Sequence, residues 1–174
     1  MATSATGDSE LAPAKVNLAL HVTGRRDDGY HLIEGLVVFA DSGDRLRLLP
    51  AAGGEPALSV KGPFAGALDK ATSAADNLAL RAVDALLGES AGRRRKPVRL
   101  LLTKRLPVAA GLGGGSADAA AALRLVNRRF RLRLGADELA RIGLRLGADV
   151  PMCLVSRPLL AEGVGERVTP VPAM

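Results

Sequence analysis

A run of glycines near the middle of the chain is the part of the sequence whose residue types and spacing point most clearly to chemistry. In PVAAGLGGGS, residues 107–116, glycine occupies positions 111, 113, 114 and 115. Glycine lacks a Cβ and adopts positive φ easily, so successive backbone N–H groups can converge on one anion. Ser116 is predicted to cap a helix whose N-terminus carries partial positive charge. The segment therefore predicts a phosphate-binding loop of the kind that holds a nucleoside triphosphate.

Two better-known phosphate loops do not match this segment. A P-loop ends in Gly-Lys-Ser/Thr, whereas Gly115 is followed here by Ser116 and Ala117. A dinucleotide fingerprint needs glycine at the position that Ser116 occupies. A tight turn without a ligand is the alternative, but each glycine costs about 0.5–1 kcal/mol in backbone entropy, which disfavours four of them without a function.

The elements that must position this loop follow from hydropathy patterning. Apolar and polar residues alternate in several short segments, which predicts strands, and apolar residues at helical spacing predict three helices. A turn-rich loop is predicted at 24–29, and Asp76 is predicted to cap the first helix. Because several strands precede that helix, the order favours an α+β fold over a doubly wound sheet. The predicted strands are 14–22, 36–40, 44–49, 57–60, 98–104 and 151–155, and the predicted helices are 76–88, 116–130 and 137–146.

Composition narrows the class of protein. Hydrophobic residues make up 48% of the 174 residues and charged residues 24%, which is typical of a soluble globular domain. A single cysteine and two histidines disfavour a disulfide framework or a cysteine-based zinc site. The chain has neither a bilayer-length apolar run nor a signal peptide, so we expect a cytoplasmic protein with no membrane partner.

The net charge of +6 raises the alternative of a basic nucleic-acid-binding module. Aromatic residues are only 2% of the chain, which leaves few stacking platforms for single-stranded nucleic acid. The dense basic run at 93–96 is predicted to be a solvated loop, and a basic balance also suits an enzyme with polyanionic substrates. We therefore expect no nucleic-acid partner.

The loop and three other segments resemble the GHMP kinases. PVAAGLGGGSADAA is similar to their ATP loop, and the triple glycine followed by Ser-x-Asp-Ala-Ala is similar to one branch. That branch phosphorylates the 2-hydroxyl of 4-diphosphocytidyl-2-C-methyl-D-erythritol in non-mevalonate isoprenoid biosynthesis. The resemblance implies the GHMP kinase N-terminal domain, with a left-handed β-α-β crossover that patterning alone would not suggest. The other matching segments are APAKVNL with GRRDDGYH, LGADVP, and EGVGE, at 12–18, 24–31, 146–151 and 162–166.

The resemblance assigns two catalytic residues. Asp149 matches the family's catalytic aspartate, and Lys15 matches the lysine near the substrate hydroxyl. Phosphoryl transfer needs a base for the hydroxyl proton and positive charge near the transferred group, which these two side chains supply. By sequence alone, Asp149 would be interpreted as a solvated residue after a helix and Lys15 as an outward-facing strand residue.

The resemblance also implies residues that bind ATP and the substrate. Asn17, Tyr30 and His31 match contacts to the cytidine diphosphate side of the substrate, although a structural imidazole is the alternative for His31. Mg²⁺ should accompany ATP, and no residue is assigned as its ligand. The residues that match the ATP site are Asn77, Lys104, Pro107, Val108, Ala109, Ala110, Gly111, Leu112, Gly113, Gly114, Gly115, Ser116 and Ala117.

The domain organisation implied is a flexible tail at 1–10 and an N-terminal ATP-binding domain at 11–174. Family members carry a second, C-terminal substrate domain, and nothing like it follows Met174. We therefore expect a truncated chain whose cleft lacks one wall and whose activity is weak or absent. Another GHMP small-molecule kinase, for homoserine or mevalonate, is the alternative; the GYH segment disfavours it, because those acids contain no cytidine.

Overall fold

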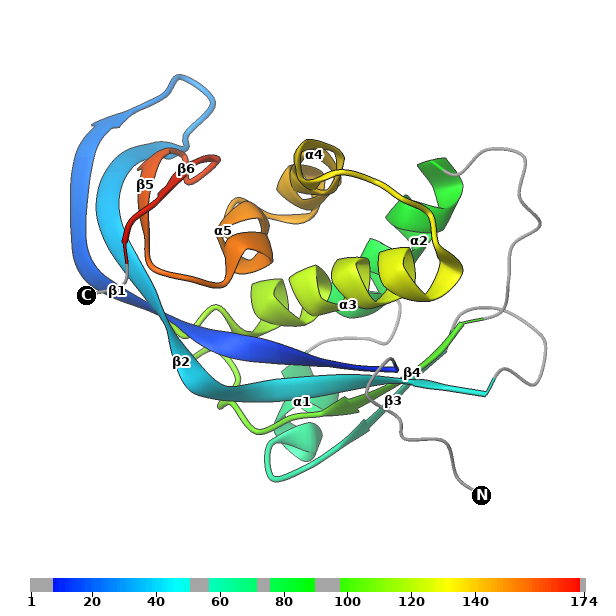
Figure 1. Cartoon of the computed structure of the whole chain (residues 1–174). Coiled ribbons are helices and arrows are strands. Elements are labelled where there is room, and N and C mark those ends of the chain that lie inside the picture. Colours follow the sequence, from blue (N-terminus) through cyan, green and yellow to red (C-terminus); the bar gives the residue numbers. More distant parts are fainter. Residues whose placement is uncertain (1–7, 51–56, 72–75, 90–97, 173–174) are drawn as a thin grey trace.

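The computed structural model describes residues 8–50, 57–71, 76–89 and 98–172. Strands and helices are mixed along the chain, which confirms the α+β class (Figure 1). The elements in order are β1 (Ser9–Arg25), β2 (His31–Leu49), β3 (Ala57–Lys61), α1 (Ala65–Ala71), α2 (Leu78–Glu89), β4 (Arg99–Thr103), α3 (Gly114–Phe130), α4 (Ala136–Leu146), α5 (Val150–Val155), β5 (Leu159–Gly163) and β6 (Arg167–Pro170).

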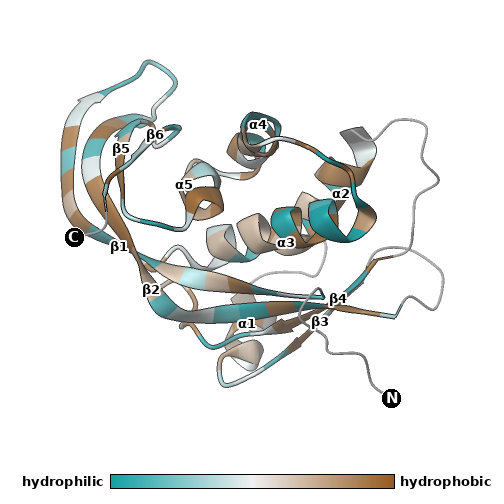
Figure 2. Ribbon diagram, in the orientation of Figure 1, coloured by the Kyte–Doolittle hydropathy of each residue, from teal (hydrophilic) through white to brown (hydrophobic). Residues whose placement is uncertain are grey.

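One curved, six-stranded sheet organises these elements. Its strand order is β3-β4-β2-β5-β6, and β1 pairs with β2 as a long antiparallel hairpin. On its other side, β2 pairs with β4 through residues 45–49 and with β5 through residues 33–37. β3 and β4 are parallel, as a crossover through α1 and α2 requires. Figure 1 shows α2, α3, α4 and α5 on the concave side of the sheet, and Figure 2 shows hydrophobic and hydrophilic residues alternating along β1 and β2.

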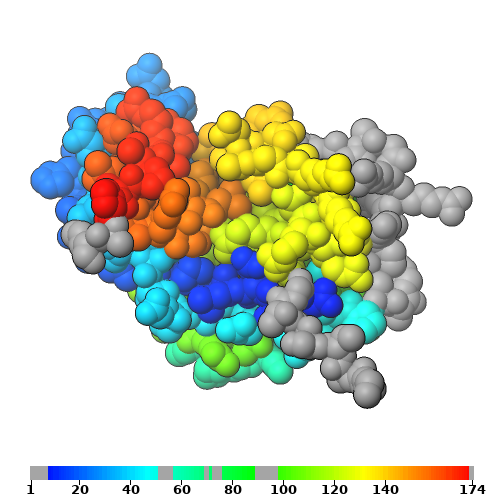
Figure 3. Space-filling model, in the orientation of Figure 1, coloured from blue at the N-terminus to red at the C-terminus, as the bar shows by residue number. Residues whose placement is uncertain are grey.

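Helix α3 lies at the centre of the main hydrophobic core. Its Ala117 and Ala119–Ala122 are fully buried, and these small side chains let the helix backbone approach the sheet closely. A smaller cluster around Met152 joins α5 to β2 and β5. Figure 3 shows the side chains of α5, in orange, between the red β5–β6 hairpin and the yellow-green helices. The strand that carries Lys15 and the helix that carries Ser116 are thus packed on one core.

Several predicted elements differ from the structure. Segments 36–40 and 44–49 were expected as two strands but form the single strand β2. Segment 151–155 is helix α5 rather than a strand, because Pro151 lies in the first turn, where proline's fixed φ favours a helix. The sequence did not predict α1, β5 or β6.

Two predicted helix caps are also corrected. Helix α3 begins at Gly114 with Gly113 as its N-cap at φ 64°, so Ser116 lies inside the helix and does not cap it. The residue before α2 is Asn77, one position later than the predicted cap, and its Oδ1 accepts a hydrogen bond from the N–H of Ala79 at 2.9 Å. Asn77, whose side-chain oxygen can cap a helix as an aspartate does, therefore caps α2.

Two sequence predictions concern chain segments outside the described residues. Residues 1–7 of the predicted tail and the basic run 93–96 both lie there. Ser9 and Glu10, predicted as tail, already pair with Arg47 and Leu46 in the β1–β2 hairpin. Across the described ranges, every helix is too short or too polar to cross a membrane.

Candidate active site

The glycine loop connects β4 to α3 and has the backbone geometry expected of an anion site. Gly111 and Gly113 have φ values of 73° and 64°, in the left-handed region. The N–H of Ala117 donates to the carbonyl of Gly113 at 2.8 Å, which begins the helical hydrogen-bond pattern. The N–H groups that precede it belong to the helix N-terminus, which has no carbonyl partners within the helix. A cavity of about 300 Å³ lies here, lined by residues 107–116 with Leu68, Leu78 and Lys104.

Two of the glycines let the loop rest on lysine side chains. A Cβ at Gly113 would lie 3.2 Å from both the Cβ and the Cε of Lys15. A Cβ at Gly114 would lie 3.0 Å from the Nζ of Lys104. A side chain at either position would therefore contact a lysine tightly, and the lysine would have to shift by a few tenths of an ångström.

Lys15 and Asp149 form an ion pair directly beside the loop. The Nζ of Lys15 lies 3.3 Å from the Oδ2 of Asp149 and also donates to the Oδ1 of Asn17 at 3.1 Å. The backbone N–H of Lys15 donates to the carbonyl of Leu112 at 2.9 Å, so the lysine is attached to the glycine loop itself. The Lys15 side chain is 6% exposed and that of Asp149 is 39% exposed.

The two members of the pair come from different elements. Lys15 lies on β1, where a register shift between Pro13 and Lys15 interrupts the pairing with β2. Asp149 is the N-cap residue of α5, and its carboxylate makes no capping hydrogen bond, so it is directed to Lys15 instead. An accessible carboxylate beside a buried ammonium can take a proton from a hydroxyl while the ammonium offers positive charge. The structure thus brings together the two side chains to which the resemblance assigns catalytic roles, and the roles themselves stay a prediction.

Beneath the loop, a second lysine is held between two buried carboxylates. The Nζ of Lys104 donates to the Oδ2 of Asp44 at 2.5 Å and to the Oδ2 of Asp118 at 3.0 Å. The Oδ1 of Asp44 accepts the backbone N–H groups of Arg105 and Leu106. All three charged residues are at most 3% exposed. This triad ties β2, the end of β4 and α3 together at the point where the loop begins.

The triad contains two carboxyl groups and only one ammonium, and burial has the largest effect on the pKa of one of the carboxyls. Burial raises the pKa of Asp118 to about 7, against the lowering effect of the Lys104 ammonium and with a further increase from Asp44. The Oδ1 of Asp118 has no hydrogen-bond partner within the described part of the chain. Burial lowers the pKa of Lys104, but the neighbouring Asp118 and the hydrogen bonds to both carboxylates outweigh it, so that pKa is raised. One carboxyl of the triad therefore changes charge near neutral pH.

Three residues predicted to contact the nucleotide have structural partners. The Asn77 side chain caps α2 and is 7% exposed, and Ala117 is fully buried against the core. Lys104 does line the cavity, but its ammonium is bound by Asp44 and Asp118. These contacts give each of the three residues a structural role, and their assignment to the ATP site stays a prediction.

Tyr30 and His31 lie at the turn of the β1–β2 hairpin, at the far end of β1 from Lys15. Both are exposed, and the N–H of Tyr30 donates to the Oδ1 of Asp28 at 3.2 Å. The ten residues from Lys15 to Arg25, which pairs with His31, span roughly 33 Å along a strand, although β1 and β2 bend strongly (Figure 1). Only Asn17 of the three predicted substrate residues touches the ion pair.

Sequence reasoning missed four charged residues around the site. Asp44 was assigned only to the start of a strand, and Glu10 to the tail. Asp118 had a usable signal, since a carboxylate inside an alanine run on a helix is predicted to be buried with that run. Arg124 pairs with Glu10 across most of the chain, and no local pattern indicates such a contact.

Comparison with known proteins agrees with this geometry. Residues 77–157 match the family model described as GHMP kinases N terminal domain. A solved mevalonate kinase from Methanococcus jannaschii has the same fold, with a TM-score of 0.66 at 12% identity, over 95% of this chain and 55% of that one. Residues 77–157 thus match the N-terminal domain of the GHMP kinases, and the chain has the fold of that domain.

The relatives with higher sequence identity share one name. A 4-diphosphocytidyl-2-C-methyl-D-erythritol kinase of Rhizobium etli is 54% identical over 168 residues, 97% of this chain and 54% of the relative. The protein of that name from Agrobacterium fabrum is 52% identical, over 94% of this chain and 54% of its own length. A crystal structure of a 4-(cytidine 5'-diphospho)-2C-methyl-D-erythritol kinase gives a TM-score of 0.72 at 41% identity, over 94% of this chain and 55% of that one. The chain thus spans about half the length of these relatives.

Proposed function

We propose that this chain binds ATP at the glycine loop and transfers its γ-phosphoryl group, weakly when the chain acts alone, to the 2-hydroxyl of 4-diphosphocytidyl-2-C-methyl-D-erythritol, a step of non-mevalonate isoprenoid biosynthesis. The observation that carries the proposal is the Lys15–Asp149 pair, 3.3 Å apart, whose lysine is hydrogen-bonded to the loop through Leu112. The similarity to the named kinases of Rhizobium and Agrobacterium supports the choice of substrate.

On the nucleotide side, the N-terminus of α3 and the positive-φ glycines would hold the phosphates. The cavity above the loop is open at Gly111, where an added Cβ would meet nothing within 4 Å, so a phosphate can approach the backbone there. Mg²⁺ would enter with ATP, since Mg²⁺ is usually held by phosphates and water with only one or two protein ligands. Within the described ranges, no group of three His, Cys, Asp or Glu residues could hold a metal. The Ser116 hydroxyl, half-buried in the first turn of α3, is the candidate protein ligand.

At the reacting centre, the substrate oxygen would form a bond to the γ-phosphorus as the bond to the β–γ bridging oxygen breaks. The exposed carboxylate of Asp149 would accept the hydroxyl proton, and the Lys15 ammonium would stabilise negative charge on the attacking oxygen and the phosphoryl group. Asn17 holds the lysine in place by accepting a hydrogen bond from its Nζ. The neighbouring Cys153 thiol is buried, which raises its pKa to about 12, so it is unsuited to act as a base.

On the substrate side, Asn17, Tyr30 and His31 would line a path along β1. The Tyr30 side chain is 58% exposed, so its ring is available to stack on a pyrimidine. We further propose that residues 11–172 act as one domain and that the protein works in the cytoplasm, where ATP is available, without a nucleic-acid or membrane partner.

Phosphorus NMR of the reaction with ATP, Mg²⁺ and the cytidine-containing alcohol tests the proposal. Asp149→Asn should lower phosphoryl transfer by about 10³-fold, because the base for the hydroxyl proton is lost. Affinity for a non-hydrolysable ATP analogue should change by less than about 3-fold, since the carboxylate is not part of the loop. Asp137→Asn, at an exposed carboxylate on α4, is the matched control and should leave both quantities unchanged.

Three results would contradict the proposal. Retained transfer in Asp149→Asn would remove the base from the mechanism. Transfer to homoserine or mevalonate in preference to the cytidine-containing alcohol would assign another acceptor. Failure of the parent chain to bind the ATP analogue would remove the nucleotide from the loop, independently of any turnover.

A further inference from the structure

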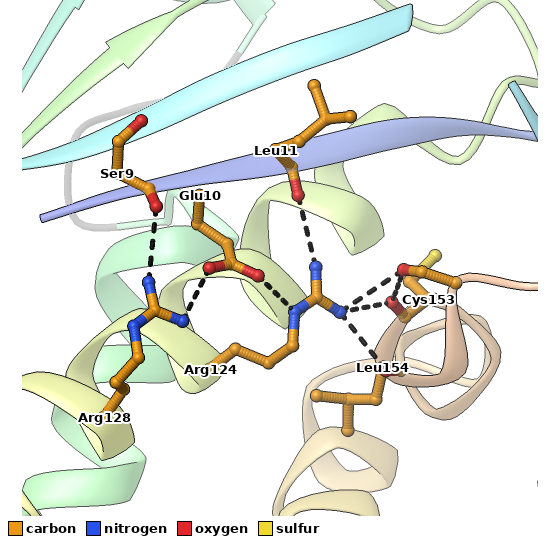
Figure 4. Close-up of polar contacts among 8 residues, drawn as sticks. Ser9, Glu10, Leu11, Arg124, Arg128, Cys153 and Leu154 are labelled. Atoms are coloured by element: carbon orange, nitrogen blue, oxygen red, sulfur yellow. Dashed lines mark hydrogen bonds and ion pairs between the residues drawn. The ribbon is translucent and has the colours of Figure 1, made fainter. Parts of the chain in front are cut away.

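The guanidinium of Arg124 lies where three elements of the site meet. Arg124 is on α3, and its side chain passes between β1 and the C-terminal end of α5 (Figure 4). On β1, its Nε lies 2.8 Å from the Oε1 of Glu10, and its Nη2 donates to the carbonyl of Leu11 at 3.2 Å. On the α5 side, its Nη1 donates to the carbonyl of Cys153 at 2.7 Å and lies 3.3 Å from both the Leu154 carbonyl and the Ser156 Oγ. All three nitrogens of the planar guanidinium thus make polar contacts, which fixes its orientation.

Through its contacts with the C-terminal end of α5, Arg124 also determines where Asp149 lies. α5 has only six residues, and its last carbonyls have no partners within the helix. A cation at this end satisfies them and opposes the negative end of the helix dipole. Asp149 stands at the other end, where its carbonyl accepts the N–H of Cys153 at 3.1 Å. Holding the C-terminal end of α5 therefore also sets the place of its first turn and of the Asp149 carboxylate.

The β1 contacts fix the other member of the ion pair. Glu10 and Leu11 lead directly into the buried segment 12–15, which ends at Lys15. The helix that carries Arg124 begins at the glycine loop, with Gly113 as its N-cap. One side chain thus connects the strand of Lys15, the helix of Asp149 and the helix that opens at the loop.

Arg128, one turn further along α3, provides an internal comparison. Its Nη1 lies 2.8 Å from the Oε2 of the same Glu10, and its Nη2 donates to the carbonyl of Ser9 at 3.2 Å. The Arg128 side chain is 46% exposed, whereas that of Arg124 is 21% exposed. Both arginines pair with one glutamate, but Arg124 also binds α5.

We propose that Arg124 is a positioning residue that sets the distance between Lys15 and Asp149 by clamping α5 onto β1. The inference rests on the proposed function for its kinetic consequence and on the geometry alone for its structural one. Without the clamp, α5 keeps its packing on α3, α4 and the cluster around Met152, and the Lys15–Asp149 pair itself is left as its polar link to β1. Misplacement of reacting groups by about 1 Å can cost about 10²-fold in rate.

The kinetic test compares Arg124→Gln with Arg128→Gln in the full chain. Each variant removes one positive charge and one contact with Glu10, so they differ in the link to α5. Arg124→Gln should lower the kcat of phosphoryl transfer by about 30-fold, with the affinity for the ATP analogue changed by less than about 3-fold. Arg128→Gln should change kcat by less than about 2-fold. Arg124→Lys should recover only part of the loss, since an ammonium cannot reproduce the fork.

Lys15 acetylation needs no turnover, so it tests the role of Arg124 separately from the proposed kinase function. The acetylation rate of Lys15, followed by mass spectrometry, should rise by about 5-fold or more in Arg124→Gln, because the lysine loses its fixed partner, and should not change in Arg128→Gln. If Arg124→Gln unfolds, Glu10→Gln is the second variant, because it keeps the size of the side chain and removes the charge that pairs with Arg124. The same changes in kcat and in the Lys15 acetylation rate are then expected, at smaller magnitude. A folded Arg124→Gln chain with the parent's kcat and Lys15 acetylation rate would overturn the inference. A parent chain that transfers no phosphoryl group, with Lys15 still protected by Arg124, would overturn the proposed function alone.

Discussion

The two halves of β1 pair with the same strand and yet have opposite surroundings. In the buried half, residues 12–15, Ala12 is fully buried and Lys15 is 5% exposed, under α3 and the glycine loop. In the exposed half, residues 16–23, every residue is exposed, and Leu18 and Val22 reach 56% and 62%. The change occurs within one residue of Lys15. The reacting pair thus lies at the boundary between a half fixed by packing and a half open to a ligand or partner.

This contrast separates the two tasks of the proposed enzyme. The groups around the phosphate and the base must be held in fixed positions. The buried half of β1 holds them through backbone hydrogen bonds and through charged side chains with little exposure to water. Recognition of a long alcohol needs accessible side chains, and the exposed half supplies Asn17 with Tyr30 and His31 beyond it. Variants on either side of the boundary should therefore behave differently.

The largest effect should come from the boundary residue itself. Lys15→Met should lower phosphoryl transfer by about 10³-fold, because the ammonium beside the reacting oxygen is lost. The fold should persist, since Asp149 is partly exposed and water can hydrate the carboxylate that remains. Kinetics and thermal unfolding measured on the same preparation check this, and a variant that unfolds without a specific loss of kcat would assign Lys15 to stability instead.

The next prediction compares a buried side chain of the core with an exposed side chain of β1. Leu102→Ala, at a fully buried site on β4, should lower the free energy of unfolding by about 2–5 kcal/mol through lost burial and a cavity. Leu18→Ala, the same substitution in the exposed half, should stay within about 0.5 kcal/mol of the parent. Urea unfolding of both variants measures the contrast. Equal losses would mean that the exposed half is covered in solution.

A smaller effect is expected in the glycine loop. Gly113→Ala and Gly111→Ala both place a Cβ at positive φ, at a cost of about 1–2 kcal/mol each. Only Gly113→Ala also presses on Lys15, at 3.2 Å, whereas the site at Gly111 is open. Gly113→Ala should therefore be the less stable variant in urea and the one that perturbs Lys15 acetylation. Identical behaviour of the two variants would argue against the contact between loop and lysine.

The smallest effect depends on pH. The pKa of Asp118 is raised to about 7 in the folded chain from an ordinary value of 3.8, so between these values the folded state binds more protons than the unfolded state. The free energy of unfolding should therefore fall as pH rises towards and through 7, by about 1 kcal/mol between pH 6 and pH 8. Asp118→Asn, which cannot titrate, should remove this slope in urea unfolding at the two pH values. A slope that survives the substitution would assign the titration to another group.

Local patterning predicted much of the fold. Alternation and helical spacing located the cores of β3 and β4 and of α2, α3 and α4, because each has one face on the core. They also located β1, although most of its predicted segment 14–22 is exposed, so the alternation there does not follow burial. The segment 41–43 separated two predicted strands, but Gly43 lies in β2, where an added Cβ would collide with the backbone of Ala12, so this glycine allows the close approach of two strands. The short apolar run 151–155 has no periodicity that distinguishes a strand from a helix.

The site was less accessible to such reasoning. Glycine spacing alone indicated a phosphate loop, because that chemistry is local in sequence. The Lys15–Asp149 pair was expected only from resemblance, since each residue by itself has an ordinary interpretation as a solvated charge. The Asp44–Lys104–Asp118 triad and the clamp at Arg124 join residues that only the folded sheet brings together.

The long strand β2 has a consequence for how the chain is made. Its residues 33–37 pair with β5, which the ribosome adds more than a hundred residues after β2, whereas β1 is already present. At about 5–20 residues per second, that edge of the nascent hairpin stays open for on the order of ten seconds. An open edge that carries Ile33, Leu36 and Val37 is a template for another chain. Yield during rapid expression should therefore depend on chaperones or low temperature more than on the final stability of the domain.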